Sequence, residues 1–266
     1  MTIKLGVIAL ATRDHGGTYQ YTLSTLQALS HVGDLEIAVY GDPQNSDLIK
    51  LGYPIRCFRE SRVRQLAALI ADRLHIRLPD RFAAQDILLA PTYSLALLHT
   101  SKPFAYTLHD VQENHYPENF FWWQRVWRHQ VHTQLLARAA RVICESRFVK
   151  ADIIRFFCVP ERQIAVMPAP PLRRPFLADT SSDRLQAVRV RLQLPEKFLF
   201  YPAQFWVHKN HLRLIEAFAE AVTEVPDLKL VLTGKKRDEY DVVMRAIGKF
   251  GLSGKVCHLE IGRAHV

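Results

Sequence analysis

Residues 3–31 read IKLGVIALATRDHGGTYQYTLSTLQALSH. Ile3–Leu10 is an apolar run of strand length, and a polar loop that contains Gly16 and Gly17 follows it. Thr18–His31 then carries apolar side chains at the spacing of one helix face. A strand, a glycine-containing loop and a helix in this order are typical of the first half of a β-α-β unit.

The same alternation continues along the chain. Strands are predicted at Leu35–Tyr40, Pro54–Phe58, Asp86–Ala90, Phe104–Leu108, Arg141–Cys144 and Ile164–Met167. Helices are predicted at Ser61–Leu78, Asn119–Ala139 and Arg147–Phe157. Because the strands are apolar throughout rather than at every second residue, they indicate an α/β fold whose parallel sheet is covered on both faces.

The pattern changes at Ala169–Pro195, where prolines and Thr180–Ser182 predict an interdomain linker with a short helix at Asp183–Leu192. It restarts with strands at Phe198–Tyr201, Leu228–Leu232 and Lys255–Leu259 and with helices at His211–Val222 and Glu239–Phe250. We therefore predict a first domain at residues 1–170, a linker at 171–195 and a second α/β domain at 196–259. The second domain is expected to be incomplete, since about 70 residues make roughly half of an ordinary domain.

The last seven residues, 260–266, read EIGRAHV. This peptide is a translation of GAGATCGGAAGAGCACACGTC, a common sequencing-adapter DNA. We therefore treat residues 260–266 as a non-native tail and expect the natural protein to continue beyond Leu259.

The composition narrows the class of protein. The chain has 266 residues, of which 48% are hydrophobic and 23% charged, and these values argue against disorder, collagen and coiled coil. No apolar run reaches the roughly 20 residues of a membrane span. The four cysteines form no CxxC pair, and Cys57 and Cys144 lie in apolar runs, so we expect buried, reduced thiols and a cytoplasmic protein.

The net charge is +9, from 35 basic and 26 acidic residues. Such a surplus favours an anionic partner, which can be a nucleic acid, an anionic lipid or a phosphorylated ligand. The charge alone does not choose among the three.

His109 and Asp110 close the predicted strand Phe104–Leu108. Ligands of open α/β sheets bind beyond the carboxyl ends of the strands, where a histidine can hydrogen-bond a sugar hydroxyl. Asp110 can fix the tautomer of that histidine or cap the next turn. The alternative is a loop histidine beside a turn-forming aspartate. The remaining histidines supply no coherent set of ligands, so no metal site is predicted.

Two predicted helices are rich in arginine. The segment Glu118–His132 reads ENFFWWQRVWRHQVH, and Ser61–Arg81 carries arginines around leucines and an isoleucine. Aromatic and basic side chains together suit a membrane interface or a lipid-linked acceptor. The alternatives, aromatic side chains packed into the core and a solvated basic helix face, are favoured.

Residues 200–211 read FYPAQFWVHKNH. They place Lys209 at the carboxyl end of a predicted strand and just before a helix, a position that suits a diphosphate by geometry and charge. A surface lysine in a loop is the alternative. Gly16 and Gly17 precede a helix in the same way, and either a phosphate site or a plain tight turn accounts for them.

Taken together, these segments resemble the retaining glycosyltransferases of family 4, which have the GT-B fold of two Rossmann-like domains. The resemblance extends over almost the whole chain up to Leu259. It is carried by Gly16-Gly17 in the first loop, by Tyr106–Asp110 (YTLHD), by Val142–Asp152 (VICESRFVKAD) and by Tyr201–Asn210 (YPAQFWVHKN), which is similar to the family's GRxxxxKG diphosphate loop.

The chain departs from the family pattern at several positions. Gln204 stands where the family usually carries arginine, and Asn210 replaces a glycine. Met167–Pro171 replaces the usual Pro-Asn-Gly. The family's Glu-x7-Glu motif would belong to the missing part of the second domain, so we expect residues 1–259 alone to be inactive.

The resemblance implies transfer of a sugar from a nucleotide-sugar to a hydroxyl acceptor, a glycan or a lipid-linked molecule, with retention of configuration and without a cofactor or metal. It implies that Lys209 and Gln204 bind the donor diphosphate, that the backbone at Gly16 and Gly17 approaches the donor, that His109 orients the sugar and that Asp110 lies on the acceptor side. We expect a cytoplasmic enzyme in peripheral contact with the anionic inner membrane face.

Two alternatives stay open. A non-catalytic protein that binds a membrane surface or nucleic acid would use the net charge, but the basic residues are scattered and no nucleic-acid-binding signature occurs. A sugar-nucleotide epimerase of the GT-B type shares the fold but matches the motifs less well. A dinucleotide dehydrogenase is disfavoured because GxGxxG is absent.

Overall fold

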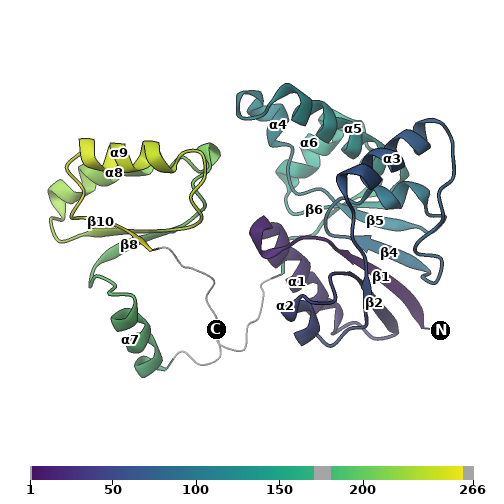
Figure 1. Ribbon diagram of the computed structural model, residues 1–266, viewed down its shortest axis with the longest axis horizontal. Coiled ribbons are helices and arrows are strands. Elements are labelled where there is room, and N and C mark those ends of the chain that lie inside the picture. The colour runs from purple at the N-terminus through teal and green to yellow at the C-terminus, as the bar shows by residue number, and fades with distance from the viewer. Residues whose placement is uncertain (1, 171–180, 260–266) are drawn as a thin grey trace. The chain divides into compact units, whose positions relative to one another are not determined.

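The computed structural model describes residues 2–170 and 181–259 of the chain. The chain divides into two compact units, Met1–Arg174 (unit 1) and Pro175–Val266 (unit 2), shown in Figure 1. Residues 171–180 of the predicted linker and the tail at 260–266 lie outside the described residues. The described end of the predicted linker contains the helix α7 (Ser182–Arg191).

Unit 1 is built on a parallel sheet with the strand order β3-β2-β1-β4-β5-β6-β7 within the described residues. The strands are β1 (Ile3–Ala9), β2 (Leu35–Gly41), β3 (Ile55–Cys57), β4 (Ile87–Ala90), β5 (Phe104–Thr107), β6 (Arg141–Cys144) and β7 (Ile164–Val166). The chain passes from β1 outward to β3 and then returns to the other side of β1 at β4. The order therefore reverses between β1 and β4, where doubly wound sheets open a crevice at the carboxyl ends of the strands.

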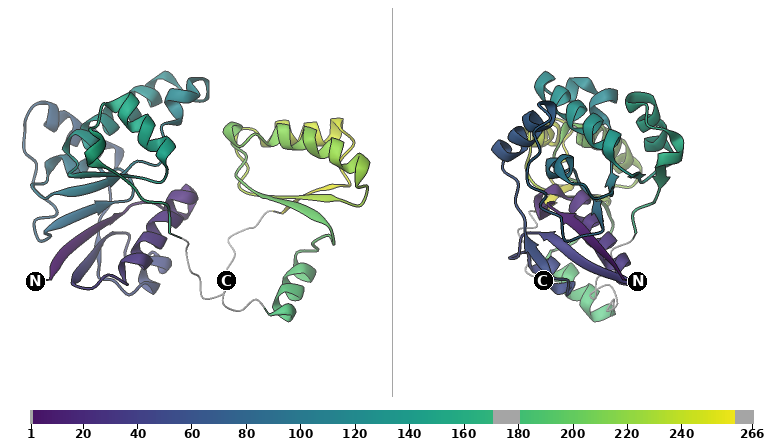
Figure 2. Two further views of the ribbon diagram at one scale, coloured as in Figure 1. Left: turned by 180° about the vertical axis from the view of Figure 1, so that it is seen from behind. Right: turned by 90° about the vertical axis from the view of Figure 1, so that its right-hand side faces the viewer.

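Helices cover both faces of this sheet. They are α1 (Gly17–Leu29), α2 (Ser46–Lys50), α3 (Arg62–Arg73), α4 (Gln112–His115), α5 (Trp122–Arg138) and α6 (Arg147–Phe157), with 3-10 turns η1 (Arg13–His15), η2 (Leu95–His99), η3 (Pro117–Asn119) and η4 (Glu161–Gln163). Figures 1 and 2 show α1 and α2 on one face and α3, α5 and α6 on the other.

The central strand explains why the sheet needs two layers of helices. Val7 and Ile8 are neighbours in β1 and point to opposite faces, and both are fully buried. Val7 belongs to the core beneath α1, and Ile8 belongs to the larger core on the other face. A strand that is buried on both faces has no polar alternation, as the sequence predicted for a parallel sheet.

Unit 2 contains a smaller parallel sheet, with the order β10-β9-β8 in its described part. Its strands are β8 (Phe198–Pro202), β9 (Lys229–Thr233) and β10 (Val256–Leu259), and its further helices are η6 (Val207–Lys209), α8 (His211–Glu224) and α9 (Tyr240–Lys249). Apolar side chains of α8 and α9, among them Phe218 and Val243, pack against Leu230 and Leu232 of β9.

Two predicted helices are shorter than expected. The helix predicted at Asn119–Ala139 begins at Trp122, because Pro117 starts a separate 3-10 turn before it. The helix predicted at Ser61–Leu78 ends at Arg73, and His75 follows in the left-handed conformation with φ 56°. A left-handed residue after the last turn is a common way to end a helix.

The prediction that the cysteines are buried is wrong for three of the four. All four cysteines are free, but only Cys144 is buried, whereas Cys57 and Cys158 are exposed. Cys57 lies in β3, the edge strand of the sheet, where fewer neighbours cover the side chains. Among the described residues, no helix has the length and apolar character that crossing a membrane requires.

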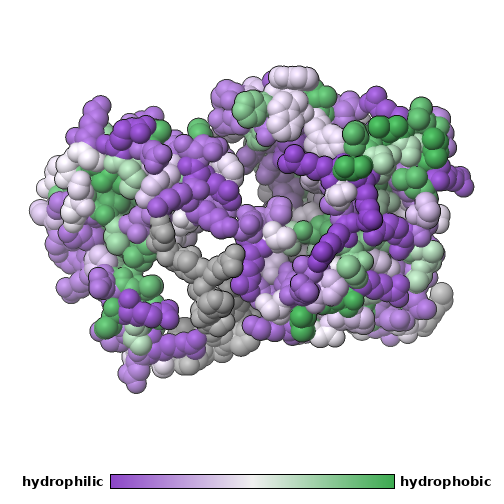
Figure 3. Space-filling view, viewed as in Figure 1, coloured by the Kyte–Doolittle hydropathy of each residue, from purple (hydrophilic) through white to green (hydrophobic). Residues whose placement is uncertain are grey.

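Core packing, the favoured interpretation of the aromatic residues in Glu118–His132, holds for Trp127 but not for those at the start of α5. The exposed fractions are 69% for Phe121, 74% for Trp122 and 52% for Trp123. The rings of Phe121 and Trp123 stack on each other, with centroids 6.2 Å apart. Apolar side chains of α3 are exposed as well, and Figure 3 shows hydrophobic atoms gathered around that helix.

Candidate functional site

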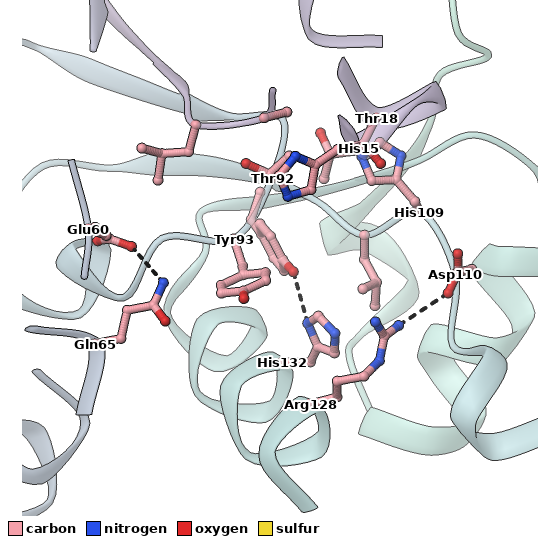
Figure 4. Close-up of a pocket in the computed structure, with 15 residues that line it drawn as sticks. His15, Thr18, Glu60, Gln65, Thr92, Tyr93, His109, Asp110, Arg128 and His132 are labelled. Carbon is pink, nitrogen blue, oxygen red and sulfur yellow. Dashed lines mark hydrogen bonds and ion pairs between the residues drawn. The ribbon is translucent and has the colours of Figure 1, made fainter. Parts of the chain in front are cut away.

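A cavity of about 430 Å³ opens in unit 1 at the carboxyl ends of β1, β4 and β5, shown in Figure 4. This is the place where the strand order reverses. The lining residues come from these strands and their loops, from the loop between β3 and α3, and from α1, α3 and α5. They are Leu10, Ala11, His15, Thr18, Glu60, Gln65, Thr92, Tyr93, Tyr106, Thr107, Leu108, His109, Asp110, Arg128 and His132.

The glycine pair lies beside this cavity. Gly16 has φ 56° and ψ −113°, a backbone conformation that side chains with a Cβ rarely adopt, and α1 begins directly after it at Gly17. No side chain caps the helix. The first backbone amides of α1 are therefore available to an anion, and Thr18 of the same turn lines the cavity.

The side chain of His15 has a defined tautomer. Its Nδ1 lies 3.0 Å from the backbone nitrogen of Thr12, which can only donate. Nδ1 must therefore accept this hydrogen bond, and the proton of the neutral ring lies on Nε2. Because His15 lines the cavity and is exposed, it offers an N–H donor to a ligand.

His109 is held on two sides of its ring. Its Nε2 lies 2.8 Å from the carbonyl oxygen of Pro91, and Nδ1 lies 3.5 Å from the carboxylate of Glu145. Since a carbonyl oxygen only accepts, Nε2 carries a proton. The rings of Tyr21 and His109 pack edge to face, with their centroids 4.8 Å apart. The loops after β4 and β5 are thereby tied together at the cavity.

Asp110 pairs with α5 rather than with His109. Its carboxylate lies 3.2 Å from Nη2 of Arg128 and accepts a hydrogen bond from the amide of Gln112 at 3.4 Å. Of the two roles considered for Asp110, the structure shows the capping of the following turn. Nε of Arg128 also lies 2.9 Å from the carboxylate of Glu113, which is buried. Figure 4 shows Arg128 reaching towards Asp110.

A buried pair, Tyr106 and His132, forms part of the cavity wall. The hydroxyl of Tyr106 lies 2.9 Å from Nδ1 of His132. Burial, with a smaller contribution from Arg128, lowers the pKa of His132 to about 3. Burial also raises the pKa of Tyr106 far above its usual range. Both side chains are therefore neutral at pH 7, and one hydrogen bond joins the hydroxyl of Tyr106 to Nδ1 of His132.

The other predicted site residues belong to unit 2. Lys209 is exposed, in η6 just before α8, and its carbonyl accepts a hydrogen bond of 2.8 Å from the hydroxyl of Tyr201. Asn210 takes the left-handed conformation with φ 54°, which asparagine tolerates better than most residues, in the place of the family's glycine. Oε1 of Gln204 accepts a hydrogen bond of 3.1 Å from Nε of Arg237.

The structure brings His109 and Asp110 together in one cavity and places Gly16 and Gly17 beside it, while Gln204 and Lys209 lie in unit 2. Sequence reasoning did not identify Glu60, Arg128 and His132 as parts of this cavity. One signal existed for two of them, because Arg128 and His132 are four residues apart and therefore share one face of α5. Within the described residues, no three His, Cys, Asp or Glu side chains gather as they would around a metal ion.

The sequence of the chain matches a family model. The model describes Glycosyltransferase Family 4 and matches residues 15–170, well over half of the chain. Over 203 residues the chain is also 22% identical to the O-antigen chain mannosyltransferase RfbU of Salmonella typhimurium, an alignment that covers 73% of this chain and 52% of that protein. The chain thus spans about half the length of this curated relative.

Solved structures share the fold at low sequence identity. The crystal structure of HepE from Anabaena in complex with UDP and glucose matches with a TM-score of 0.68 and 18% identity, covering 97% of this chain and 69% of that one. The UDP-GlcNAc 2-epimerase of Methanocaldococcus jannaschii matches with a TM-score of 0.56 and 14% identity, covering 98% and 74%. The expected α/β fold of the GT-B type is confirmed. On the family match, the chain belongs to Glycosyltransferase Family 4.

Proposed function

We propose that the protein transfers a sugar from a nucleotide-sugar donor to a hydroxyl acceptor, with retention of the anomeric configuration. The observation that carries this proposal is the cavity at the reversal point of the first sheet, beside the uncapped start of α1, in a chain of Glycosyltransferase Family 4. Open α/β sheets bind their ligands at this point. The complex of HepE with UDP and glucose supports a nucleotide-sugar as donor.

The donor diphosphate binds at the carboxyl end of β8. Lys209 supplies a positive charge there, and the N-terminus of α8 adds free amides. Gln204 contributes a hydrogen bond. The backbone at Gly16 and Gly17 approaches the donor, and His109 orients the transferred sugar. Cationic side chains and helix N-termini neutralise the leaving diphosphate, so that the reaction proceeds without a metal ion or other cofactor.

The acceptor binds to unit 1 on the side of Asp110, and it is a glycan or a lipid-linked molecule. The name of the Salmonella relative, an O-antigen chain mannosyltransferase, supports a role in building a glycan. The cavity supports a hydroxyl-bearing ligand, because its polar lining includes an N–H donor at His15 and the hydroxyl of Tyr93. Nucleic acid is not a partner in this proposal.

The protein acts in the cytoplasm, in peripheral contact with the anionic inner face of the membrane. The exposed rings of Phe121, Trp122 and Trp123 support this contact, since aromatic side chains concentrate at membrane interfaces. The amphipathic helix α3 adds exposed apolar side chains together with arginines that attract anionic lipid.

Ligand protection tests the proposal. At least one nucleotide-sugar from a panel that includes UDP-glucose and GDP-mannose should raise the melting temperature of the protein. Duplex DNA should not raise it. The opposite result, protection by DNA alone, would point to a nucleic-acid-binding protein. Product analysis with and without acceptor separates transfer from epimerisation, because an epimerase changes the nucleotide-sugar without any acceptor.

Sugar transfer is measured by following the glycosylated acceptor, and the configuration of its new bond is read by NMR. A product of inverted configuration would contradict the retaining mechanism.

A further inference from the structure

Unit 2 places a second cation close to the proposed diphosphate site. The loop after β8 carries Gln204 and Lys209, and the loop after β9 carries Arg237. Because β8 and β9 are neighbouring parallel strands, both loops leave the same edge of the sheet. The cationic side chains on the two loops therefore belong to one end of unit 2.

Close backbone packing holds the two loops against each other. The amide of Phe205 donates to the carbonyl of Lys235 at 3.2 Å, and the amide of Glu239 donates to the carbonyl of Phe205 at 3.2 Å. At Gly234, whose φ is +139°, a Cβ atom would lie 2.2 Å from the carbonyl oxygen of Ala203. Only glycine allows this approach. The position of the second loop relative to the first is thus fixed.

The guanidinium group of Arg237 is oriented by two side chains of the first loop. Its Nε donates to Oε1 of Gln204 at 3.1 Å, and its Cζ lies 4.9 Å from the ring centroid of Trp206. Both contacts restrict the plane of the guanidinium group, and the side chain is half-buried. Arg237 is thereby prepared to bind without first losing much side-chain entropy.

The terminal nitrogens of Arg237 remain available to a ligand. An open depression of about 550 Å³ lies beside the side chain, and Asp238 and Asp241 line it as well. Neither carboxylate forms an ion pair with Arg237, and in the described part of the chain no other group bonds its terminal nitrogens. These nitrogens carry four N–H donors in a fixed plane.

We propose that Arg237 is the second cation of the diphosphate site, beside Lys209, and that Gln204 and Trp206 position it. The inference rests on the proposed function and names a further residue of its donor site. A diphosphate carries more than one negative charge, and a lysine acts on it as a single point charge. Arginine adds two parallel donors that bind two phosphate oxygens at once. Arg237 therefore supplies the positive charge that the neutral side chain of Gln204 does not provide.

The test measures the binding of UDP, GDP, ADP, CDP and dTDP to the chain by isothermal titration calorimetry. Arg237→Gln should weaken the binding of the preferred nucleoside diphosphate by roughly 10- to 100-fold. This is the range expected for the loss of charge-assisted hydrogen bonds. The double variant Gln204→Arg/Arg237→Gln moves the guanidinium to the adjacent side chain and should recover most of the affinity. A purely structural role of Arg237 would give no such recovery.

Arg245→Gln is the matched control, because it removes an exposed arginine from α9 and should bind like the wild type. Unfolding midpoints in urea verify that each variant is folded. If Arg237→Gln does not fold, Arg237→Lys replaces it, and we expect a loss of a few-fold because an ammonium group cannot bind two oxygens in one plane. Unchanged affinity of that variant overturns the inference.

Two outcomes separate this inference from the proposed function. If Lys209→Gln binds more than about tenfold more weakly while Arg237→Gln stays within about twofold of Arg245→Gln, the inference fails and the proposed function stands. If the wild-type chain binds none of the five diphosphates, both fail together.

Discussion

The hydroxyl of Tyr106 on β5 lies 2.9 Å from Nδ1 of His132 on α5, and both side chains are buried. The hydrogen bond joins the sheet to the helix that covers it at the wall of the cavity. Nε2 of His132 has no hydrogen-bond partner among the described residues. Protonation of the His132 ring would therefore bury a charge.

This relationship predicts a dependence of stability on pH. The pKa of His132 is about 3 in the folded protein and 6.5 in the unfolded chain. As the pH falls, the unfolded chain therefore binds the proton first. The contribution of His132 to stability is complete above pH 6.5 and is lost on descending towards pH 3. We expect a loss of roughly 2–3 kcal/mol between pH 6 and pH 4 from this group.

The measurement is urea unfolding of the wild type and of His132→Gln at several pH values. Glutamine keeps an acceptor for Tyr106 but does not titrate, so the difference between the two proteins isolates the histidine. Equal pH slopes for both proteins would show that His132 is not neutral and buried as described.

A pair of glycines in unit 2 gives a second prediction. Gly234→Ala should destabilise the unit by at least about 2 kcal/mol, because φ is +139° and the new Cβ would meet the backbone at Ala203. Gly248→Ala is the control: its Cβ meets no atom within 4 Å, and it lies in α9, where alanine should add roughly 0.5–1 kcal/mol. Urea midpoints that shift alike for both variants would contradict the packing of the two loops.

The sequence was sufficient to predict the strands. The strand at Arg141–Cys144 and the helix at Arg147–Phe157 are confirmed to the residue, because three apolar residues after Arg141 and a serine cap mark them locally. The short turns around Pro117 were not predicted. The helix prediction began at Asn119, in the 3-10 turn that starts at Pro117, rather than at Trp122.

The cavity could be predicted only in part. His109 and Asp110 follow directly from the end of a strand, which is a local signal. Glu60 reaches the cavity by accepting a hydrogen bond from the hydroxyl of Ser94 at 2.7 Å, a contact between loops far apart in the sequence. Arg237 meets Gln204 in the same way across two loops. Such contacts depend on which strands are neighbours in the sheet. A single sequence does not reveal which distant loops will meet.

The third prediction concerns Gly17 at the start of α1. A Cβ added there would meet no protein atom within 4 Å, so Gly17→Ala should leave the unfolding midpoint almost unchanged. The same Cβ would obstruct a phosphate that approaches the backbone, and donor affinity should fall by about tenfold or more. Calorimetry and urea unfolding of the same sample check both statements, and unchanged donor affinity would remove Gly17 from the site.

The fourth prediction concerns the exposed rings at the start of α5. The double variant Trp122→Ser/Trp123→Ser should bind vesicles of phosphatidylglycerol and phosphatidylcholine about tenfold or more weakly, since both side chains are more than half exposed and would enter the interface. Phe250→Ser, which removes an exposed ring from unit 2, is the control. Co-sedimentation measures binding, and equal loss in both variants would argue against a contact through α5.

The last prediction separates the structural and functional roles of His109 by comparison with His99. Both rings have Nε2 within hydrogen-bond distance of a backbone carbonyl, at 2.8 Å from Pro91 and at 2.9 Å from Ala68, but only His109 lines the cavity. His109→Gln and His99→Gln should therefore each cost about 1 kcal/mol of stability. Only His109→Gln should lower the turnover of sugar transfer, by roughly 10- to 100-fold, because it alone would orient the donor sugar. Turnover assays of the intact protein alongside urea unfolding distinguish the two effects, and equal turnover in the two variants would leave His109 with a purely structural role.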